Sequence, residues 1–286
     1  MNIEYRNVTL ITQHHEEKAS IFEALVRVLQ EILTAQKKSP FFEALVKVLQ
    51  KILTTQNLGF KPYPVEQIHC TVMQLEAVVE SGLCYSKYLY EKGIRDPIDF
   101  NSLASFIRSH LAVPICVSFG GYKRGDRSFM TLERQEPFQR SFYVGTGDVA
   151  SAAISGWPTG EPDKIDLLRR KFIEVNIGEK WPRPKDEVGG LFSVLGHWPK
   201  FKNDPATRVP FVGLKLADVA TRLRNFMEGL DVSVQWIRDC LKPVEIIVSH
   251  DKTAVVRYDD PALPLATTRK ILVSKLDGRS LEELYR

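Results

Sequence analysis

The stretch EQIHCTVMQL, residues 66–75, places a histidine and a threonine two positions apart within an apolar segment. Side chains of a β-strand alternate between its two faces, so His69 and Thr71 point to one side while Cys70 and Val72 point to the other. The apolar residues are typical of a buried strand. Two polar side chains on one face of such a strand indicate either a structural hydrogen bond or one half of a catalytic site.

The composition is that of an ordinary globular protein. The chain has 286 residues, 44% of them hydrophobic and 26% charged, which is enough for one large domain or two small ones. The formal net charge of +4 is compatible with a phosphate-bearing ligand and is low for a dedicated DNA-binding protein. The sequence shows no apolar stretch long enough to cross a membrane and no secretory signal, so we expect a cytoplasmic protein with no membrane partner.

The cysteines indicate neither a disulfide framework nor a zinc site. They are widely spaced and form no CxxC pair and no cluster with histidines at metal-ligand spacing. We therefore expect no bound metal and no cofactor. The four residues are Cys70, Cys84, Cys116 and Cys240.

An internal repeat is the clearest feature of the chain's organisation. Residues 21–36, IFEALVRVLQEILTAQ, recur as residues 41–56, FFEALVKVLQKILTTQ, and twelve of the sixteen positions are identical. Apolar residues recur at helical spacing in both copies, which predicts an amphipathic helix for each. Two copies are too few for a solenoid, so we interpret them as a local duplication of one helix. Each copy either packs within the chain or offers its apolar face to a protein partner or to a second copy of the chain.

Strands and helices alternate along the rest of the chain, and no linker rich in Pro, Gly or Ser separates the two halves. We therefore predict an α+β fold with two pseudo-symmetric lobes of mainly antiparallel sheet, covered by helices, around a central cleft. Residues 1–286 would form one bilobal domain, with the duplicated helices (20–60) inserted after the first strand and a C-terminal tail at 265–286. The expected elements are strands at 7–13, within 66–75 (the strand that carries His69), at 113–122, 140–147 and 189–198, a β-hairpin at 243–258, and helices at 99–111, from about 162, and at 216–230.

This layout resembles the two-histidine (2H) phosphoesterases, a superfamily that includes 2′-5′ RNA ligase-like proteins and cyclic phosphodiesterases. In that family each lobe contributes a strand with the pattern His-x-Thr/Ser followed by an apolar residue, and the two motifs face each other across a cleft. Residues 69–72, His-Cys-Thr-Val, match the first motif, and the element order matches over most of the chain. The resemblance implies a metal-independent phosphoesterase that acts on 2′,3′-cyclic phosphates, cyclic nucleotides or 2′-5′-linked RNA ends.

The second motif is incomplete. When Ser193 in GGLFSVLGHW (189–198) is aligned with the Thr/Ser of the motif, Leu191 stands where the histidine belongs. The resemblance gives His69 the role of general acid or base, and gives Thr71 and Ser193 the role of hydrogen-bond donors to phosphate oxygens. Two other histidines are candidates to replace the missing one: His197, which shares the face of Ser193 if the strand is regular, and His250 in the expected hairpin.

Two further segments carry basic and aromatic side chains suited to binding a nucleotide. Tyr122, Lys123 and Arg124 lie in the turn YKRGDR, and Lys61 and Tyr63 lie in the loop just before the strand of His69. The alternatives are a solvated turn for the first segment and a loop that covers the core for the second.

Three functions remain open from the sequence. A general acid or base contributes about 10²–10⁴-fold to a reaction rate, so loss of one histidine impairs catalysis without removing a phosphate-binding site. The candidates are a 2H-type phosphoesterase, a non-catalytic module that binds a nucleotide or an RNA end, and an interaction protein that acts through the duplicated helices.

Overall fold

The structure is a computed structural model. The first helix copy (21–36), the helix expected at 216–230 and Cys240 lie outside the residues that it describes. The described residues are 3–12, 46–47, 49–51, 53–54, 60–64, 67–146, 149–179, 184, 186–202, 235, 237–239, 241–258 and 268–286.

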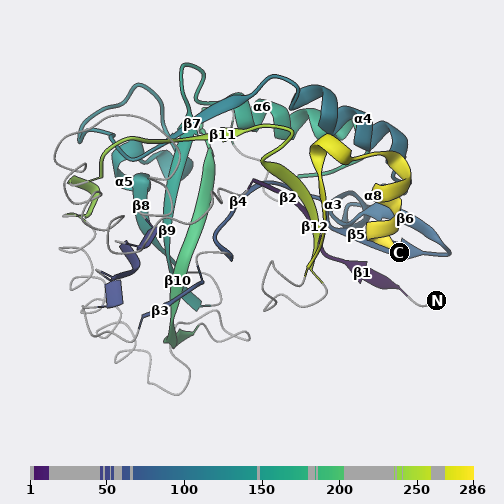
Figure 1. Cartoon of the computed structure of the whole chain (residues 1–286), viewed down its shortest axis with the longest axis horizontal. Coiled ribbons are helices and arrows are strands. Elements are labelled where there is room, and N and C mark those ends of the chain that lie inside the picture. The colour runs from purple at the N-terminus through teal and green to yellow at the C-terminus, as the bar shows by residue number, and fades with distance from the viewer. Residues whose placement is uncertain are drawn as a thin grey trace.

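The fold is α+β and its sheet ladders are antiparallel, which confirms the predicted class. Within the described part of the chain, the strands form a six-stranded, a four-stranded and a three-stranded sheet. Figure 1 shows the six-stranded sheet on the left and the other two sheets on the right. Strand β4 (Cys70–Gln74), which contains Thr71, lies between them.

The four-stranded sheet carries the first motif. Its strand order is β13-β12-β2-β4, and His69 directly precedes β4. Thr71 lies opposite Ile11, Met73 lies opposite Leu10, and Val72 between them has no opposite residue, so β4 contains a β-bulge at this point. The strands are β13 (Arg269–Leu272), β12 (Thr253–Arg257), β2 (Val8–Thr12) and β4 (Cys70–Gln74).

The six-stranded sheet contains the strands expected at 113–122, 140–147 and 189–198, together with a long strand that the sequence did not indicate, β9. This strand pairs with β7, β8 and β10 and so holds the sheet together. The strands are β11 (Val244–Val248), β7 (Ile115–Phe119), β9 (Val149–Pro158), β10 (Leu191–Lys202), β3 (Lys61–Pro62) and β8 (Phe142–Thr146).

The β-hairpin expected at 243–258 is wrong. Both strands are present, but β11 pairs with β7 in the six-stranded sheet, whereas β12 pairs with β2 and β13 in the four-stranded sheet. The chain crosses from one sheet to the other between them. A strand-turn-strand pattern fixes the two strands locally and does not fix their partners.

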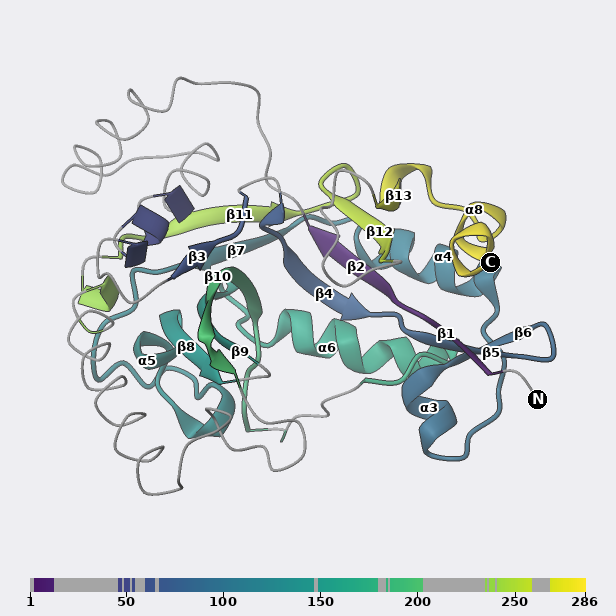
Figure 2. The same cartoon turned by 90° about the horizontal axis from the view of Figure 1, so that it is seen from below.

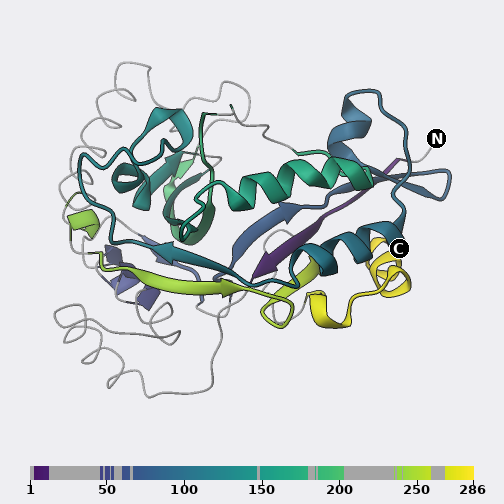
Figure 3. The same cartoon turned by 90° about the horizontal axis from the view of Figure 1, so that it is seen from above.

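Two of the helices, α4 (Phe100–His110) and α6 (Lys164–Lys171), lie on one side of the sheets. Figures 1 and 3 show α4 and α6 crossing the upper face of the strands, and their apolar residues join those of the strands in one core. Asp99 caps α4, because its carboxylate accepts hydrogen bonds from the N–H groups of Asn101 and Ser102. No described helix is long and apolar enough to cross a membrane. The helices are α3 (Lys87–Glu91), α4 (Phe100–His110), α5 (Pro137–Ser141), α6 (Lys164–Lys171) and α8 (Gly278–Tyr285), with 3₁₀ turns at Leu132–Arg134, Phe172–Val175 and Val273–Lys275.

The described part of the second helix copy packs within the chain. Val46, Leu49 and Leu53 are buried in the main core. Gln50, on the same helix, donates hydrogen bonds from its amide nitrogen to the carbonyl oxygens of Tyr63 (2.8 Å) and Leu195 (2.7 Å). In these residues the apolar stripe is therefore covered by the chain itself.

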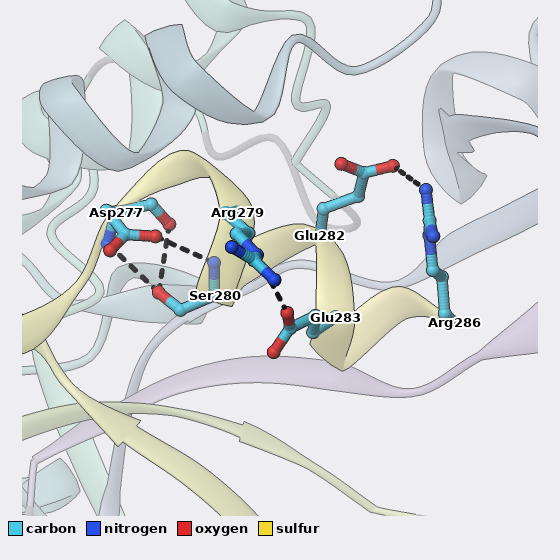
Figure 4. Close-up of polar contacts among 6 residues, drawn as sticks. All are labelled: Asp277, Arg279, Ser280, Glu282, Glu283 and Arg286. Atoms are coloured by element: carbon cyan, nitrogen blue, oxygen red, sulfur yellow. Dashed lines mark hydrogen bonds and ion pairs between the residues drawn. The ribbon is translucent and has the colours of Figure 1, made fainter.

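The end of the chain is built into the fold. Strand β13 pairs with β12, and α8 packs on the four-stranded sheet and on α4, where the ring of Tyr285 lies 5.0 Å from that of Phe100. Figure 4 shows how α8 begins: the carboxylate of Asp277 accepts the N–H of Ser280 at 2.7 Å. The same view shows ion pairs between Arg279 and Glu283 and between Glu282 and Arg286 along the helix surface. Residues 268–286 thus contribute to the core, whereas the sequence analysis described 265–286 as a C-terminal tail.

The small third sheet lies beside the four-stranded sheet at the end of the molecule that carries both chain termini (Figures 1 and 2). It consists of β1 (Glu4–Arg6), β5 (Ala77–Glu80) and β6 (Leu83–Ser86).

Candidate active site

His69 is held by hydrogen bonds at both ring nitrogens. Its Nδ1 lies 2.7 Å from the carbonyl oxygen of Gln67, which can only accept, so Nδ1 carries the proton and donates. Nε2 then carries the lone pair and accepts the hydroxyl of Tyr258 at 3.3 Å. The geometry fixes the neutral tautomer whose Nε2 can take a proton.

Burial supports the same protonation states. Loss of solvent lowers the pKa of His69 below its ordinary 6.5, against a smaller opposite effect of the hydrogen bond to Gln67. Burial also raises the pKa of Tyr258 to about 12, so its phenol stays protonated and donates. At neutral pH the pair is therefore a neutral imidazole that faces a phenol.

Thr71 shares the face of His69. It lies opposite Ile11, and Ile11 forms a small buried cluster with Ala254 and Val256, against which Tyr258 packs. This face points away from the core covered by α4 and α6. The side chain of Thr71 is half-buried, and its hydroxyl makes no hydrogen bond within the part of the chain that the structure describes.

Ser193 and Leu191 lie on the opposite, inner face. Both side chains are 0% exposed. The Ser193 hydroxyl donates to the carbonyl oxygen of His69 at 2.9 Å and, having used its only proton, accepts the thiol of Cys70 at 2.9 Å. The expectation that Ser193 binds phosphate is therefore corrected: its hydroxyl has no access to a ligand, and it holds the backbone of His69 instead.

The β-bulges of β4 and β10 provide a structural alignment of the two strands. In β4 the extra residue, Val72, follows Thr71 directly. In β10 the extra residue is Leu195, between Val194 and Gly196. Matching the two bulges aligns residues 192–195 with residues 69–72.

This match pairs His69 and Thr71 of β4 with Phe192 and Val194 of β10, whereas the sequence alignment paired them with Leu191 and Ser193. The side-chain contact between Cys70 and Ser193 supports this alignment, because both stand at the middle position of their motif. Phe192 is 38% exposed, as a residue on the outer face should be. The second lobe thus presents two apolar side chains where the first presents a histidine and a threonine.

A buried ion pair holds the bulge of β4. Arg169 of α6 donates to the carbonyl oxygens of Val72 (2.7 Å) and Thr71 (3.2 Å) and pairs with Asp166 at 2.8 Å. The other carboxylate oxygen of Asp166 accepts the N–H of Gly189 at 2.5 Å, just before β10. One ion pair, 3–5% exposed, therefore fixes both site strands.

Lys61, Tyr63 and His197 form a group at the edge of the six-stranded sheet. His197 lies opposite Lys61 in the ladder, and its ring centre is 5.3 Å from that of Tyr63. Because the bulge at Leu195 shifts the alternation by one, His197 shares the face of Val194 and not that of Ser193, contrary to the regular-strand expectation.

The turn YKRGDR and His250 have protein partners elsewhere. The Tyr122 ring packs edge-on against Trp157 at 5.0 Å, and its hydroxyl donates to the carbonyl oxygen of Ser118. Arg124 pairs with Asp239 at 3.1 Å. Lys123 is exposed.

In Figures 1 and 2 the segment between β7 and α5, which contains this turn, lies at the end of the molecule away from β12. His250 hydrogen-bonds through Nε2 to the carbonyl oxygen of Arg108 at the end of α4. The structure brings neither the turn nor His250 to His69.

Tyr258 is the site residue that the sequence did not reveal. It continues the alternation of Ala254 and Val256, so its position on their face was readable, but the pairing of β12 with β2 was not. Arg169 and Asp166 were likewise hidden, since an i,i+3 pair of opposite charges usually lies on a helix surface.

Comparisons with known proteins give little further information. No family model and no curated protein match the chain. A solved structure of Kluyveromyces marxianus Usb1 with uridine monophosphate is similar over 95% of this chain and 98% of that chain, with 9% sequence identity and a TM-score of 0.37. These values establish neither a family nor a function for this chain. Among the described residues, no cluster of His, Cys, Asp or Glu is arranged to hold a metal ion.

Proposed function

We propose that the chain is a phosphoesterase for 2′,3′-cyclic phosphates, cyclic nucleotides or 2′-5′-linked RNA ends, and that His69 performs its proton transfers. The observation that carries the proposal is the state of His69: Nδ1 donates to Gln67, and Nε2 is a lone-pair acceptor that already faces a hydroxyl. A water molecule or a ribose hydroxyl bound in place of that phenol would meet a neutral nitrogen that can take up its proton.

The reaction balances with one histidine. As water attacks the phosphorus of a cyclic phosphate, Nε2 takes its proton and the new P–O bond forms. The bond to the ribose oxygen breaks, and the imidazolium returns the proton to that oxygen, which restores neutral His69. The hydroxyl of Thr71, on the same face, donates a hydrogen bond to a non-bridging oxygen on which charge accumulates. No step requires a group from the second lobe, whose corresponding positions are apolar.

The test is turnover of 2′,3′-cyclic nucleotides and of 2′-5′-linked dinucleotides by the parent and by His69→Gln. Glutamine keeps an amide that can reach Gln67 but cannot take up a proton. We expect His69→Gln to lower kcat by about 10²–10⁴-fold. His110→Gln is the matched control, because the Nδ1 of His110 also lies close to a backbone carbonyl, that of Phe106 (3.0 Å), in α4.

Turnover should also persist in excess EDTA, because neither His69 nor Thr71 acts through a metal in this mechanism. Equal turnover by the parent and His69→Gln would refute the proposal. A parent that binds nucleoside monophosphates without turnover, and loses binding in His69→Gln, would instead identify the non-catalytic nucleotide or RNA-end binder.

A protein partner at the duplicated helices is the remaining alternative. Val46, Leu49, Gln50 and Leu53 of the second copy make their contacts within the chain. We therefore rank this function below the two that depend on His69.

A further inference from the structure

The site lacks the second hydroxyl that the motif pattern assigned to Ser193. That hydroxyl is 0% exposed and bonded to the carbonyl oxygen of His69. Another hydroxyl, that of Tyr258, lies 3.3 Å from the working nitrogen of His69. We propose that Tyr258 is a substrate-contacting residue whose phenol donates a hydrogen bond to a non-bridging oxygen of the phosphate bound beside His69. This inference rests on the proposed function, since it names a further contact of the same site.

The contact between Tyr258 and His69 must open when a substrate binds. Gln67 occupies Nδ1, so Nε2 is the nitrogen left for proton transfer, and the Tyr258 hydroxyl occupies it in the free protein. A water or ribose hydroxyl that gives its proton to Nε2 takes the place of that phenol. The phenol then needs a new acceptor within a few ångströms.

A phosphate group supplies that acceptor. The oxygens of one phosphate are close neighbours, so two groups that bind adjacent oxygens also lie a few ångströms apart, as Tyr258 and Nε2 do. A hydrogen bond to an anionic oxygen is roughly twice as strong as one between neutral groups. Exchange of the imidazole nitrogen for a phosphate oxygen therefore favours the bound state.

The position of Tyr258 suits this role because it is anchored independently of His69. Its backbone N–H donates to the carbonyl oxygen of Asn7 at 2.9 Å. Its side chain packs on the cluster of Ile11, Ala254 and Val256. The phenol is presented from the end of β12 and the imidazole from the start of β4, so the two can separate slightly without disturbing either strand.

The first test is Tyr258→Phe, which keeps the ring and its packing and removes only the hydroxyl. We expect kcat to fall by about 10²-fold, as for the loss of one donor to a charged transition state. We also expect the Kd for a nucleoside 3′-monophosphate to rise about 10-fold, as for the loss of a hydrogen bond to a charged group. Tyr5→Phe is the matched control, because Tyr5 is a 61% exposed phenol on β1. Circular dichroism melts of both variants establish that the fold is intact.

A second measurement separates contact with substrate from mere positioning of His69. The phenol stabilises neutral imidazole, so its removal raises the pKa of His69 and moves the acid limb of the kcat/KM profile to higher pH. If that were its whole effect, Tyr258→Phe would regain parental activity at higher pH and bind the nucleotide normally. This result would overturn the proposal.

The outcomes also distinguish this inference from the proposed function. One outcome is that His69→Gln loses activity while Tyr258→Phe keeps the parental kcat and Kd. The proposed phosphoesterase function would then hold, and Tyr258 would not contact the substrate. Absence of turnover combined with weaker nucleotide binding by Tyr258→Phe would keep Tyr258 as a contact residue while the phosphoesterase failed.

Discussion

At the scale of single residues, the protonation of His69 connects folding with the site. The imidazole is neutral in the folded chain because burial lowers its pKa below 6.5, and the unfolded chain restores the ordinary value. The residue therefore makes stability depend on pH only between 6.5 and the lowered pKa of the folded state, and the stability lost across that range stays lost at lower pH.

The first prediction concerns stability in this range. Between 6.5 and the lowered pKa of the folded state, the unfolded chain binds a proton that the folded chain does not. The free energy of unfolding must then fall as the pH falls. At pH values above 6.5, and at pH values below the pKa of the folded state, His69 does not make the free energy of unfolding change with pH. Urea unfolding at about pH 7.5 and about pH 5 should show a larger loss of stability for the parent than for His69→Gln. Equal losses would contradict a lowered pKa.

The second prediction tests the alignment of the two motifs. Phe192→His combined with Val194→Thr places a histidine and a threonine at the outer-face positions of β10. We expect kcat to rise by about 10-fold or more, because a second acid or base then serves the leaving oxygen. Leu191→His should instead lose stability by about 1–3 kcal/mol without a gain in kcat, since it buries a polar ring in the core. Activity gained by Leu191→His alone would show that the sequence-based alignment was right.

At the scale of elements, the two site strands are fixed by side chains from outside their sheets. Arg169 satisfies the carbonyl oxygens at the bulge of β4, and Gln50 together with the N–H of Tyr63 satisfies the carbonyl oxygen of Leu195 at the bulge of β10. A bulge interrupts the regular ladder, so its backbone groups need such partners. The direction in which the site side chains point depends on these contacts.

The third prediction is that Arg169→Met destabilises the fold by about 3–5 kcal/mol, because it leaves the carboxylate of Asp166 buried without its cation. It should also lower kcat in whatever folded protein remains, since Thr71 loses the donor on its carbonyl oxygen. Lys171→Met, at an exposed position of the same helix, is the control. Urea unfolding and turnover measure the two effects. A cost below about 1 kcal/mol would show that the ion pair is not needed.

The sequence predicted some features of the site and could not predict others, for physical reasons. The alternation of side chains along a strand correctly placed His69 and Thr71 on one face. It holds for these two residues because both precede the bulge at Val72. In β10 the residues from 191 to 195 are apolar apart from Ser193, so hydrophobicity does not distinguish the two faces. Gly196 is the sequence feature that marks the bulge at Leu195. A Cβ at this position would clash with the carbonyl oxygen of Lys61, so a glycine is required there. The role of Tyr258 depended on a pairing between distant strands, which local patterns do not encode.

At the scale of the whole molecule, α8 connects strands from distant parts of the chain. The hydroxyl of Tyr285 donates to the carbonyl oxygen of Leu75, just after β4, at 2.8 Å. Arg6 at the end of β1 donates to the carbonyl oxygen of Tyr285, and Arg257 at the end of β12 donates to that of Leu284. The helix therefore stabilises the sheet that carries His69, Thr71 and Tyr258.

The fourth prediction follows from this arrangement. Tyr285→Phe leaves the carbonyl oxygen of Leu75 buried without a donor, which should cost about 1–3 kcal/mol of unfolding free energy. Asp277→Ala removes the cap at the start of α8 and should cost about 1 kcal/mol. Thermal melts of both variants, with Tyr5→Phe as a control, measure these costs. No change in Tyr285→Phe would mean that α8 contributes little to the four-stranded sheet.

The four-stranded sheet also has a consequence for biosynthesis. The hydroxyl of Thr12 on β2 bonds the carbonyl oxygen of Lys252, 240 residues later, and 189 residues separate His69 from Tyr258. Such distant pairings form late, because the intervening chain must first be made and its loop closed. On the ribosome, β2 can pair with β4 early, but the other edge of β2 stays open until β12 emerges, whereas the strands of the other sheet from β7 to β10 are available to pair before then. A nascent chain released before β12 emerges would carry His69 without β12 and without Tyr258, its hydrogen-bond partner.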